Sequence, residues 1–486
     1  MDVSRVFLSG AGFLADAYDL FVINVAVDIM DKNDYHQPLT SEMKATVKSM
    51  ALVGAIFGQI FFGSLADMIG RRKVFIMTCG LVIIGALLSA TVVDSEVFGI
   101  YSQLSLWRFL LGFGIGGEYP LSAAITSESA GAKDRTKCLA MVFSMQGFGT
   151  LLCSLVLVLS THCITTYDAQ WRFALGMGGV PMAIAFYFRW KMHETSWAEE
   201  ERRKNSTIQD HELARSIEPT KQSLRSASEA MLNILLENKN KLLGTAGTWF
   251  LLDIVFYANG LFSGQVSKAI GGIQTPKGEA ISSLLLQSIS LPGYICSIFF
   301  CERIGLKRLQ EFSFLIIACL FGLLSVLHPQ LKTIGPGYLV LYGITFFFQN
   351  FGPNTTTYII PSLVYNHKIK GTCHGISAAA GKLGAVVGAY VFVYSTEGFC
   401  TSGDCDDGDA DSSKDHGIML SFGLCSIIGF IGWSWSVLYT PYCYETAGLN
   451  DRKNMKPTVT EEPPSENEIG EDNRNTVSPL TKYLIE

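Results

Sequence analysis

Long apolar runs dominate the pattern of hydrophobic and polar positions along this chain of 486 residues. A helix crosses the core of a bilayer with about 20 apolar residues, and twelve stretches of that kind follow one another. They span 6–30, 46–69, 74–93, 97–128, 138–160, 172–190, 242–264, 280–301, 311–328, 337–362, 373–395 and 417–439. We therefore predict an all-α membrane protein with twelve transmembrane helices, which has the lipid bilayer as its surroundings.

Polar segments divide these helices into two sets of six. The stretch 191–240 is rich in Lys, Arg and Glu, and we interpret it as a cytoplasmic central loop between an N-terminal half, 1–190, and a C-terminal half, 241–440. The tail 441–486 is polar, with adjacent glutamates and prolines, and is predicted to be disordered.

A basic turn recurs at the same place in each half. Residues 63–73, between the second and third predicted helices, hold Asp67, Arg71 and Arg72, and residues 301–308 occupy the matching position in the second half. Two pseudo-symmetric halves with corresponding turns are what the major facilitator architecture predicts. We expect Asp67, Arg71 and Arg72 to act as a gate that holds one conformational state. The simpler alternative is a loop that only orients the chain.

The distribution of basic residues predicts the orientation. Lys and Arg gather in alternate short loops, whereas the loop 404–415 carries six aspartates. The positive-inside rule then places both termini and the central loop in the cytoplasm, and we expect a multi-pass protein of the plasma membrane. Cys400 and Cys405 would lie outside, where oxidising conditions favour a disulfide between them.

Composition excludes several classes of protein. The hydrophobic fraction is 49% and the charged fraction only 16%, whereas soluble proteins carry about a quarter charged residues. A net charge of −6 argues against a nucleic-acid partner. No constellation of nucleophile and base and no metal-ligand spacing appears, so we expect neither an enzyme nor a cofactor nor a metal site.

Charged residues inside the predicted helices carry the clearest functional signal. Each costs about 2.5 to 3.5 kcal/mol to place at membrane depth, so each is expected to have a partner or a function. They are Asp16, Asp19, Arg108, Glu118, Asp253 and Lys382. The helices that hold them, the first, fourth, seventh and eleventh, can all line a central site.

Asp16 and Asp19 are three residues apart and therefore share a helix face. Two close carboxylates do not both ionise cheaply, so one of them is expected to hold a proton. This arrangement suits a proton carrier. The alternative is a pair of acids at a helix end in water.

Trp249, Asp253 and Tyr257 form one stripe along the seventh predicted helix. An aromatic stripe alone is usually core packing, but the acid between the two rings favours a binding site. Lys382 lies about ten residues into its helix, too deep for snorkelling, and offers the cation that an anionic cargo requires.

Two predicted helices contain an interruption at corresponding places. The fourth holds four glycines and a proline within 112–120, and the tenth holds a polar stretch with Gly352 and Pro353 at 351–358. Broken segments at matching positions of two halves point to a transport site, and we expect both helices to break there. The glycines do not form a dinucleotide-binding fingerprint, because no strand precedes them.

Five stretches resemble the plant and fungal phosphate:proton symporters of the major facilitator superfamily: 16–21, 116–122, 248–257, 350–354 and 372–382. The resemblance covers nearly all twelve helices and implies a secondary active transporter that imports inorganic phosphate with protons by alternating access. It implies that a set of side chains between the halves contacts phosphate, with a lysine supplying charge: Tyr119, Gln146, Trp249, Asp253, Tyr257, Asn354 and Lys382.

The same resemblance implies that Asp19, together with Asp16, and Glu118 carry protons, with Arg108 tuning Glu118. The family usually has Asp where this chain has Glu118, which is one methylene longer. Three alternatives stay open: a glycerophosphodiester or other organophosphate as cargo, a transporter-like phosphate sensor, and coupling to sodium.

Overall fold

The computed structural model describes residues 3–131, 133–191, 233, 235–261, 263–269, 275–366, 369–397 and 407–443. All of them belong to one compact unit, Met1–Ala447. Over these residues the regular secondary structure is helical throughout. Cys400 and Cys405 lie outside the described residues, as do most of the predicted central loop and the predicted tail.

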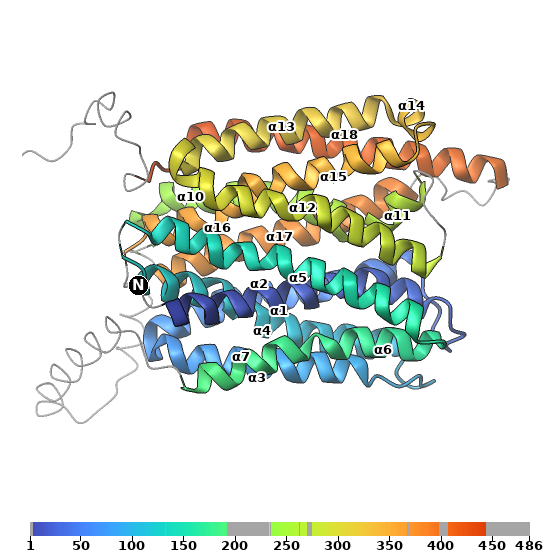
Figure 1. Ribbon diagram of the computed structural model, residues 1–486, viewed down its shortest axis with the longest axis horizontal. Coiled ribbons are helices and arrows are strands. Elements are labelled where there is room, and N and C mark those ends of the chain that lie inside the picture. Colours follow the sequence, from blue (N-terminus) through green and yellow to red (C-terminus); the bar gives the residue numbers. More distant parts are fainter. Residues whose placement is uncertain are drawn as a thin grey trace, which may run out of the picture. The chain divides into compact units, whose positions relative to one another are not determined.

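The helices form two sets, which Figure 1 shows as the blue-to-green and the green-to-red ribbons. The N-terminal half consists of α1 (Val3–Met30), α2 (Ser41–Ile69), α3 (Arg71–Ala90), α4 (Ile100–Ser129), α5 (Arg135–Cys163), α6 (Tyr167–Met177) and α7 (Gly179–Lys191). The C-terminal half consists of α10 (Lys239–Leu261), α11 (Ser263–Ala269), α12 (Pro276–Ile304), α13 (Leu306–Val326), α14 (His328–Lys332), α15 (Pro336–Phe351), α16 (Pro353–Val364), α17 (Lys370–Glu397) and α18 (Asp407–Tyr439).

Twelve segments of this bundle are long enough to cross a bilayer, which confirms the predicted number. Eight single helices among the described residues meet the length and hydropathy that a span requires: α2, α3, α5, α10, α12, α13, α17 and α18. α1 and α4 are equally long and carry the charged residues noted above. The pairs α6–α7 and α15–α16 each form one further segment, broken at Gly178 and at Gly352.

The repeated basic turn has the same backbone in both halves. α2 ends at Gly70 with a φ of 97°, and α12 ends at Gly305 with a φ of 90°. Residues other than glycine are strained at such φ angles. Glycine therefore allows the chain to turn directly from α2 into α3 and from α12 into α13. The internal repeat seen in the sequence is therefore a repeat of local structure.

The predicted break in the fourth helix is wrong. α4 runs without interruption from Ile100 to Ser129, with Pro120 inside it. Its glycines serve close packing instead: a Cβ added at Gly112 would lie 1.9 Å from the Ala51 carbonyl oxygen, and one at Gly116 would lie 2.5 Å from the Ala55 oxygen. These glycines let α4 lie directly on the backbone of α2.

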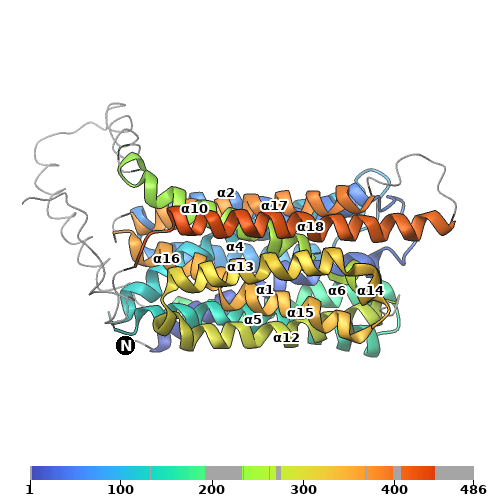
Figure 2. The same ribbon diagram turned by 90° about the horizontal axis from the view of Figure 1, so that it is seen from above.

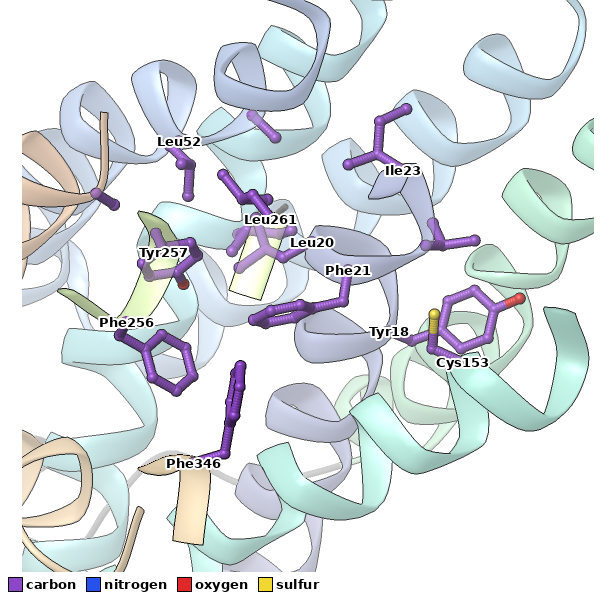
Figure 3. Packing of buried hydrophobic residues seen from close by; sticks show 14 of the residues in the cluster. Tyr18, Leu20, Phe21, Ile23, Leu52, Cys153, Phe256, Tyr257, Leu261 and Phe346 are labelled. Carbon is purple, nitrogen blue, oxygen red and sulfur yellow. The ribbon is translucent and has the colours of Figure 1, made fainter. Parts of the chain in front are cut away.

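The two halves meet along α2 with α17 and along α5 with α12, and Figure 2 shows α2 beside α17. We call the end of the bundle that holds the start of α1 the inner end and the opposite end the outer end. Towards the outer end the interface is apolar (Figure 3): Phe21 of α1 stacks on Tyr257 of α10, with ring centroids 5.9 Å apart, and packs edge-on against Phe256.

Candidate functional site

A buried ion pair lies between α10 and α17. Lys382 donates from Nζ to Asp253 Oδ2 at 3.0 Å, and the two side chains are only 2% and 1% exposed. The helices approach closely there because α17 has glycines against α10: a Cβ at Gly384 would lie 2.2 Å from the Phe250 carbonyl oxygen. The structure thus joins two of the predicted site residues from separate helices.

Tyrosines from both halves enclose the ammonium group of Lys382. Its Nζ lies 4.6 Å from the ring centroid of Tyr257, on α10, and 5.0 Å from that of Tyr119, on α4. Cation–π contacts of this kind favour a charged lysine away from water. Because Tyr119 belongs to the N-terminal half and Tyr257 to the C-terminal half, the two tyrosines span the junction between the halves.

The other predicted substrate contacts include buried neutral side chains. Asn354, at the start of α16, donates to Tyr294 Oη at 3.1 Å and to Asn350 Oδ1 at 2.7 Å. Gln146 of α5 is 3% exposed, and its Oε1 has no hydrogen-bond partner among the described residues. Trp249 packs against Tyr119, with ring centroids 6.2 Å apart. Neutral hydrogen-bonding groups of this kind can bind a small oxyanion.

Tyr294 and His374 are site residues that the sequence prediction did not include. Tyr294 of α12 accepts the hydrogen bond from Asn354, and the ring of His374 meets Trp249 edge-on at 5.6 Å. A tyrosine in an apolar helix has no pattern that distinguishes it from a core residue. His374 lies inside a stretch that carries the family resemblance, which was the available signal.

A second buried ion pair lies within the N-terminal half. Arg189, near the end of α7, donates from Nη1 to Glu118 Oε1 and from Nη2 to Glu118 Oε2, both at 2.7 Å. Thr78 Oγ1 also donates to Glu118 Oε1, at 2.8 Å. Both charged side chains are fully buried. Glu118 is therefore bound on both carboxylate oxygens.

Arg108, to which the resemblance assigns tuning of Glu118, contacts Asp19. Its Nη2 donates to the backbone oxygen of Asp19 at 2.5 Å, whereas Glu118 is held by Arg189. Arg108 is one of the charged groups that act on the Asp19 carboxylate. The physical reason is position: ten residues separate Arg108 from Glu118 along a continuous α4, which places them about 15 Å apart along the helix.

The two acids of α1 have different surroundings. Asp16 and Asp19 are 1% and 0% exposed, and among the described residues none of their four carboxylate oxygens has a hydrogen-bond partner. Asp19 lies against the α6–α7 junction, where a Cβ at Gly178 would be 1.8 Å from its Oδ1. Asp16 lies close enough to Glu118 and Arg189 for both charged groups to interact electrostatically with its carboxylate. Burial without partners excludes the alternative of acids at a hydrated helix end.

Contacts at the inner end join the halves through the predicted gate residues. Asp67 Oδ2 accepts from the Thr372 backbone nitrogen at 2.8 Å and from Thr372 Oγ1 at 2.9 Å. Arg71 pairs with Asp67 and with Glu128, both at 3.2 Å. Arg72 contacts α7 instead, donating to the Trp190 oxygen at 2.7 Å. Asp67 therefore links the N-terminal half to α17 of the C-terminal half.

A charged group at the outer end also joins the halves, and the sequence prediction did not include it. Lys48 of α2 donates to the Leu261 backbone oxygen at 3.1 Å, and Asn24 of α1 donates to the Gly260 oxygen at 2.9 Å. Asp28 forms a salt bridge with Lys44. Contacts between the halves therefore close the bundle over the site at both ends.

Comparison with known proteins agrees with this arrangement. The family model of sugar (and other) transporters matches residues 6–440. A low affinity inorganic phosphate transporter of Petunia hybrida is 34% identical over 443 residues, covering 81% of this chain and 83% of its own length. An inorganic phosphate transporter of Arabidopsis thaliana is 34% identical over 487 residues, covering 90% and 91%.

Solved structures show the same fold. The proton:xylose symporter XylE, a protein of the major facilitator superfamily, superposes with a TM-score of 0.71 over 91% of this chain and 98% of its own, at 18% identity. The likeness extends over both halves and matches the predicted architecture.

Proposed function

The chain belongs to the family of sugar (and other) transporters, and inorganic phosphate transporters are among its relatives. We propose that it is a secondary active transporter that imports inorganic phosphate together with protons. One observation carries the proposal: the buried Lys382 lies between tyrosines of both halves and pairs with the carboxylate of Asp253. A sugar needs no such cation, whereas a phosphate monoanion does.

The Lys382–Asp253 pair supplies the logic of binding and release. Phosphate and Asp253 compete for the same ammonium group, and two anions in a low-dielectric site repel each other. A proton on Asp253, or one shared with phosphate, removes that repulsion and frees Lys382 for the substrate. Loss of the proton on the inner side restores the pair and expels phosphate. Tyr119, Gln146, Tyr257 and Asn354 supply hydrogen bonds to the bound anion.

Protons also reverse the cost of the membrane potential. Moving one negative charge against an inside-negative potential costs about 2.3 kcal/mol per 100 mV. Entry of a monoanion with two protons or more carries net positive charge, so the potential drives uptake. Asp16, Asp19 and Glu118 are the buried acids that we assign to this coupling. We further propose that both termini lie in the cytoplasm and that the protein resides in the plasma membrane.

The test is uptake of radiolabelled phosphate into sealed proteoliposomes with and without an inside-alkaline proton gradient. We expect gradient-driven accumulation that a protonophore abolishes and that excess xylose leaves unchanged. Uptake that persists without a proton gradient but requires sodium would replace the coupling ion. Competition by glycerophosphoinositol, with no accumulation of phosphate itself, would assign the organophosphate cargo.

A further inference from the structure

Both terminal nitrogens of the Arg189 guanidinium group are bound by groups of the N-terminal half. Besides the two bonds to Glu118, Nη1 donates to Cys79 Sγ at 2.9 Å and Nη2 donates to the Leu8 oxygen at 3.3 Å. The ring of Phe75 lies beneath it, 3.4 Å from Cζ to the ring centroid. An arginine bound in this way has a fixed position, because its planar fork matches the carboxylate.

α1 passes directly against this ion pair. A Cβ added at Gly12 would lie 2.1 Å from Arg189 Nη2 and 2.3 Å from Glu118 Oε2. Asp16 is four residues further along α1 and therefore lies one turn away on the same face. The charged groups that act on the Asp16 carboxylate come from α4, α7, α1 and α17: Glu118, Arg189, Asp19 and Lys382.

This cluster contains two acids and one fixed cation. Arg189 neutralises one carboxylate, so one proton is needed to neutralise the other. Glu118 accepts three hydrogen bonds, from Arg189 and Thr78, so both of its carboxylate oxygens already have donors. Asp16 has no hydrogen-bond partner among the described residues, and burial without a partner favours the neutral acid.

We propose that Arg189 is a positioning residue for proton coupling: it occupies both carboxylate oxygens of Glu118, so that Asp16 carries the exchangeable proton of this cluster. The inference rests on the proposed phosphate:proton symport. In the cycle Asp16 takes a proton from water on the outer side and releases the same proton to water on the inner side, while no other bond changes. Removal of Arg189 leaves two acids without their cation, so that the cluster binds protons more tightly and releases them only at a higher internal pH.

The test uses the full chain in proteoliposomes and two assays: accumulation of labelled phosphate driven by a proton gradient, and counterflow of phosphate, which needs no net proton release. We expect Arg189→Gln to lower accumulation by about tenfold or more, because the acids left without their cation retain their protons on the inner side. Counterflow should stay within about threefold of wild type, and the internal pH of half-maximal accumulation should move to alkaline values.

Two further variants separate positioning from folding. Glu118→Gln combined with Arg189→Gln removes one charge of each sign and should return the pH profile towards that of wild type. Arg189→Lys keeps the charge and should give an intermediate profile. Arg172→Gln is the matched control: Arg172 is an arginine of the same half whose ion pair with Asp168 is partly exposed, and the pH profile should not change.

An unchanged pH profile in Arg189→Gln would overturn the inference, as would equal loss of counterflow and accumulation in a variant that is purified folded. If Arg189→Gln fails to fold, the double variant tests the assignment instead. An internal pH of half-maximal accumulation far from the wild-type value would then contradict it. The wild-type protein distinguishes the two proposals, because absence of phosphate counterflow there would reject phosphate transport itself.

Discussion

The two buried ion pairs have the same net charge and very different surroundings. Glu118–Arg189 is bidentate and is enclosed by helices of one half only, whereas Asp253–Lys382 rests on one hydrogen bond and lies between tyrosines of both halves. Arginine offers a rigid fork, and lysine offers a point charge on a flexible stem. We infer from this difference that the Glu118–Arg189 pair stays formed during the cycle, whereas Lys382 exchanges Asp253 for a substrate.

Loss of the exchangeable cation should give the largest effect. Lys382→Gln removes the cation that binds phosphate, and truncation of one partner of a buried charge pair costs about 2 to 5 kcal/mol of binding free energy, or at least about a 30-fold loss of phosphate affinity. Equilibrium binding of labelled phosphate to the purified protein measures it. Lys382→Arg is the matched variant and should retain part of the affinity. Unchanged binding in Lys382→Gln would remove Lys382 from the site.

A change at the acid of the same pair should separate binding from release. Asp253→Asn still accepts a hydrogen bond from Lys382 but no longer competes as an anion. We expect uptake to fall at least about tenfold, because one charged hydrogen bond contributes about 1.5 to 3 kcal/mol, while affinity changes little. Uptake and equilibrium binding are compared on one preparation. Equal loss in both would contradict the release mechanism.

A smaller effect is expected where α1 touches the fixed pair. Gly12→Ala forces a methyl group against Arg189 and Glu118, and overpacking of this kind costs about 1 to 3 kcal/mol. Gradient-driven accumulation should fall severalfold, more than counterflow does. Gly80→Ala is the control, because a Cβ there has no atom within 4 Å. If both variants behave like wild type, the fixed pair does not need its close contact with α1.

Much of the fold could be predicted from local sequence, because membrane helices are identified by their length and hydropathy. The turns at Gly70 and Gly305 also repeat in the sequence as they do in the structure. The expected break in α4 failed for a physical reason. Glycines and a proline indicate a weak helix, but a single sequence does not show that the backbone of α2 lies against them.

Only some of the site residues could be predicted from the sequence. Asp253 and Lys382 were predicted because each is a charge deep in an apolar run, and the structure brings them together. Arg189 was missed because it lies one residue before the end of its predicted helix, where a basic residue reads as an anchor at the membrane surface. Lys48 and Asn24 were missed in the same way: residues near helix ends have an ordinary explanation until the partner across the interface is known.

The outer closure has a consequence for how this protein can change over evolutionary time. Lys48 and Asn24 are side chains of the N-terminal half, but the groups that accept their hydrogen bonds, at Leu261 and Gly260, are backbone carbonyls. A backbone acceptor is present whichever amino acid occupies the position. Replacement of Leu261 by another apolar residue therefore leaves the acceptor in place, and the genetic information for this closure resides almost wholly in one half.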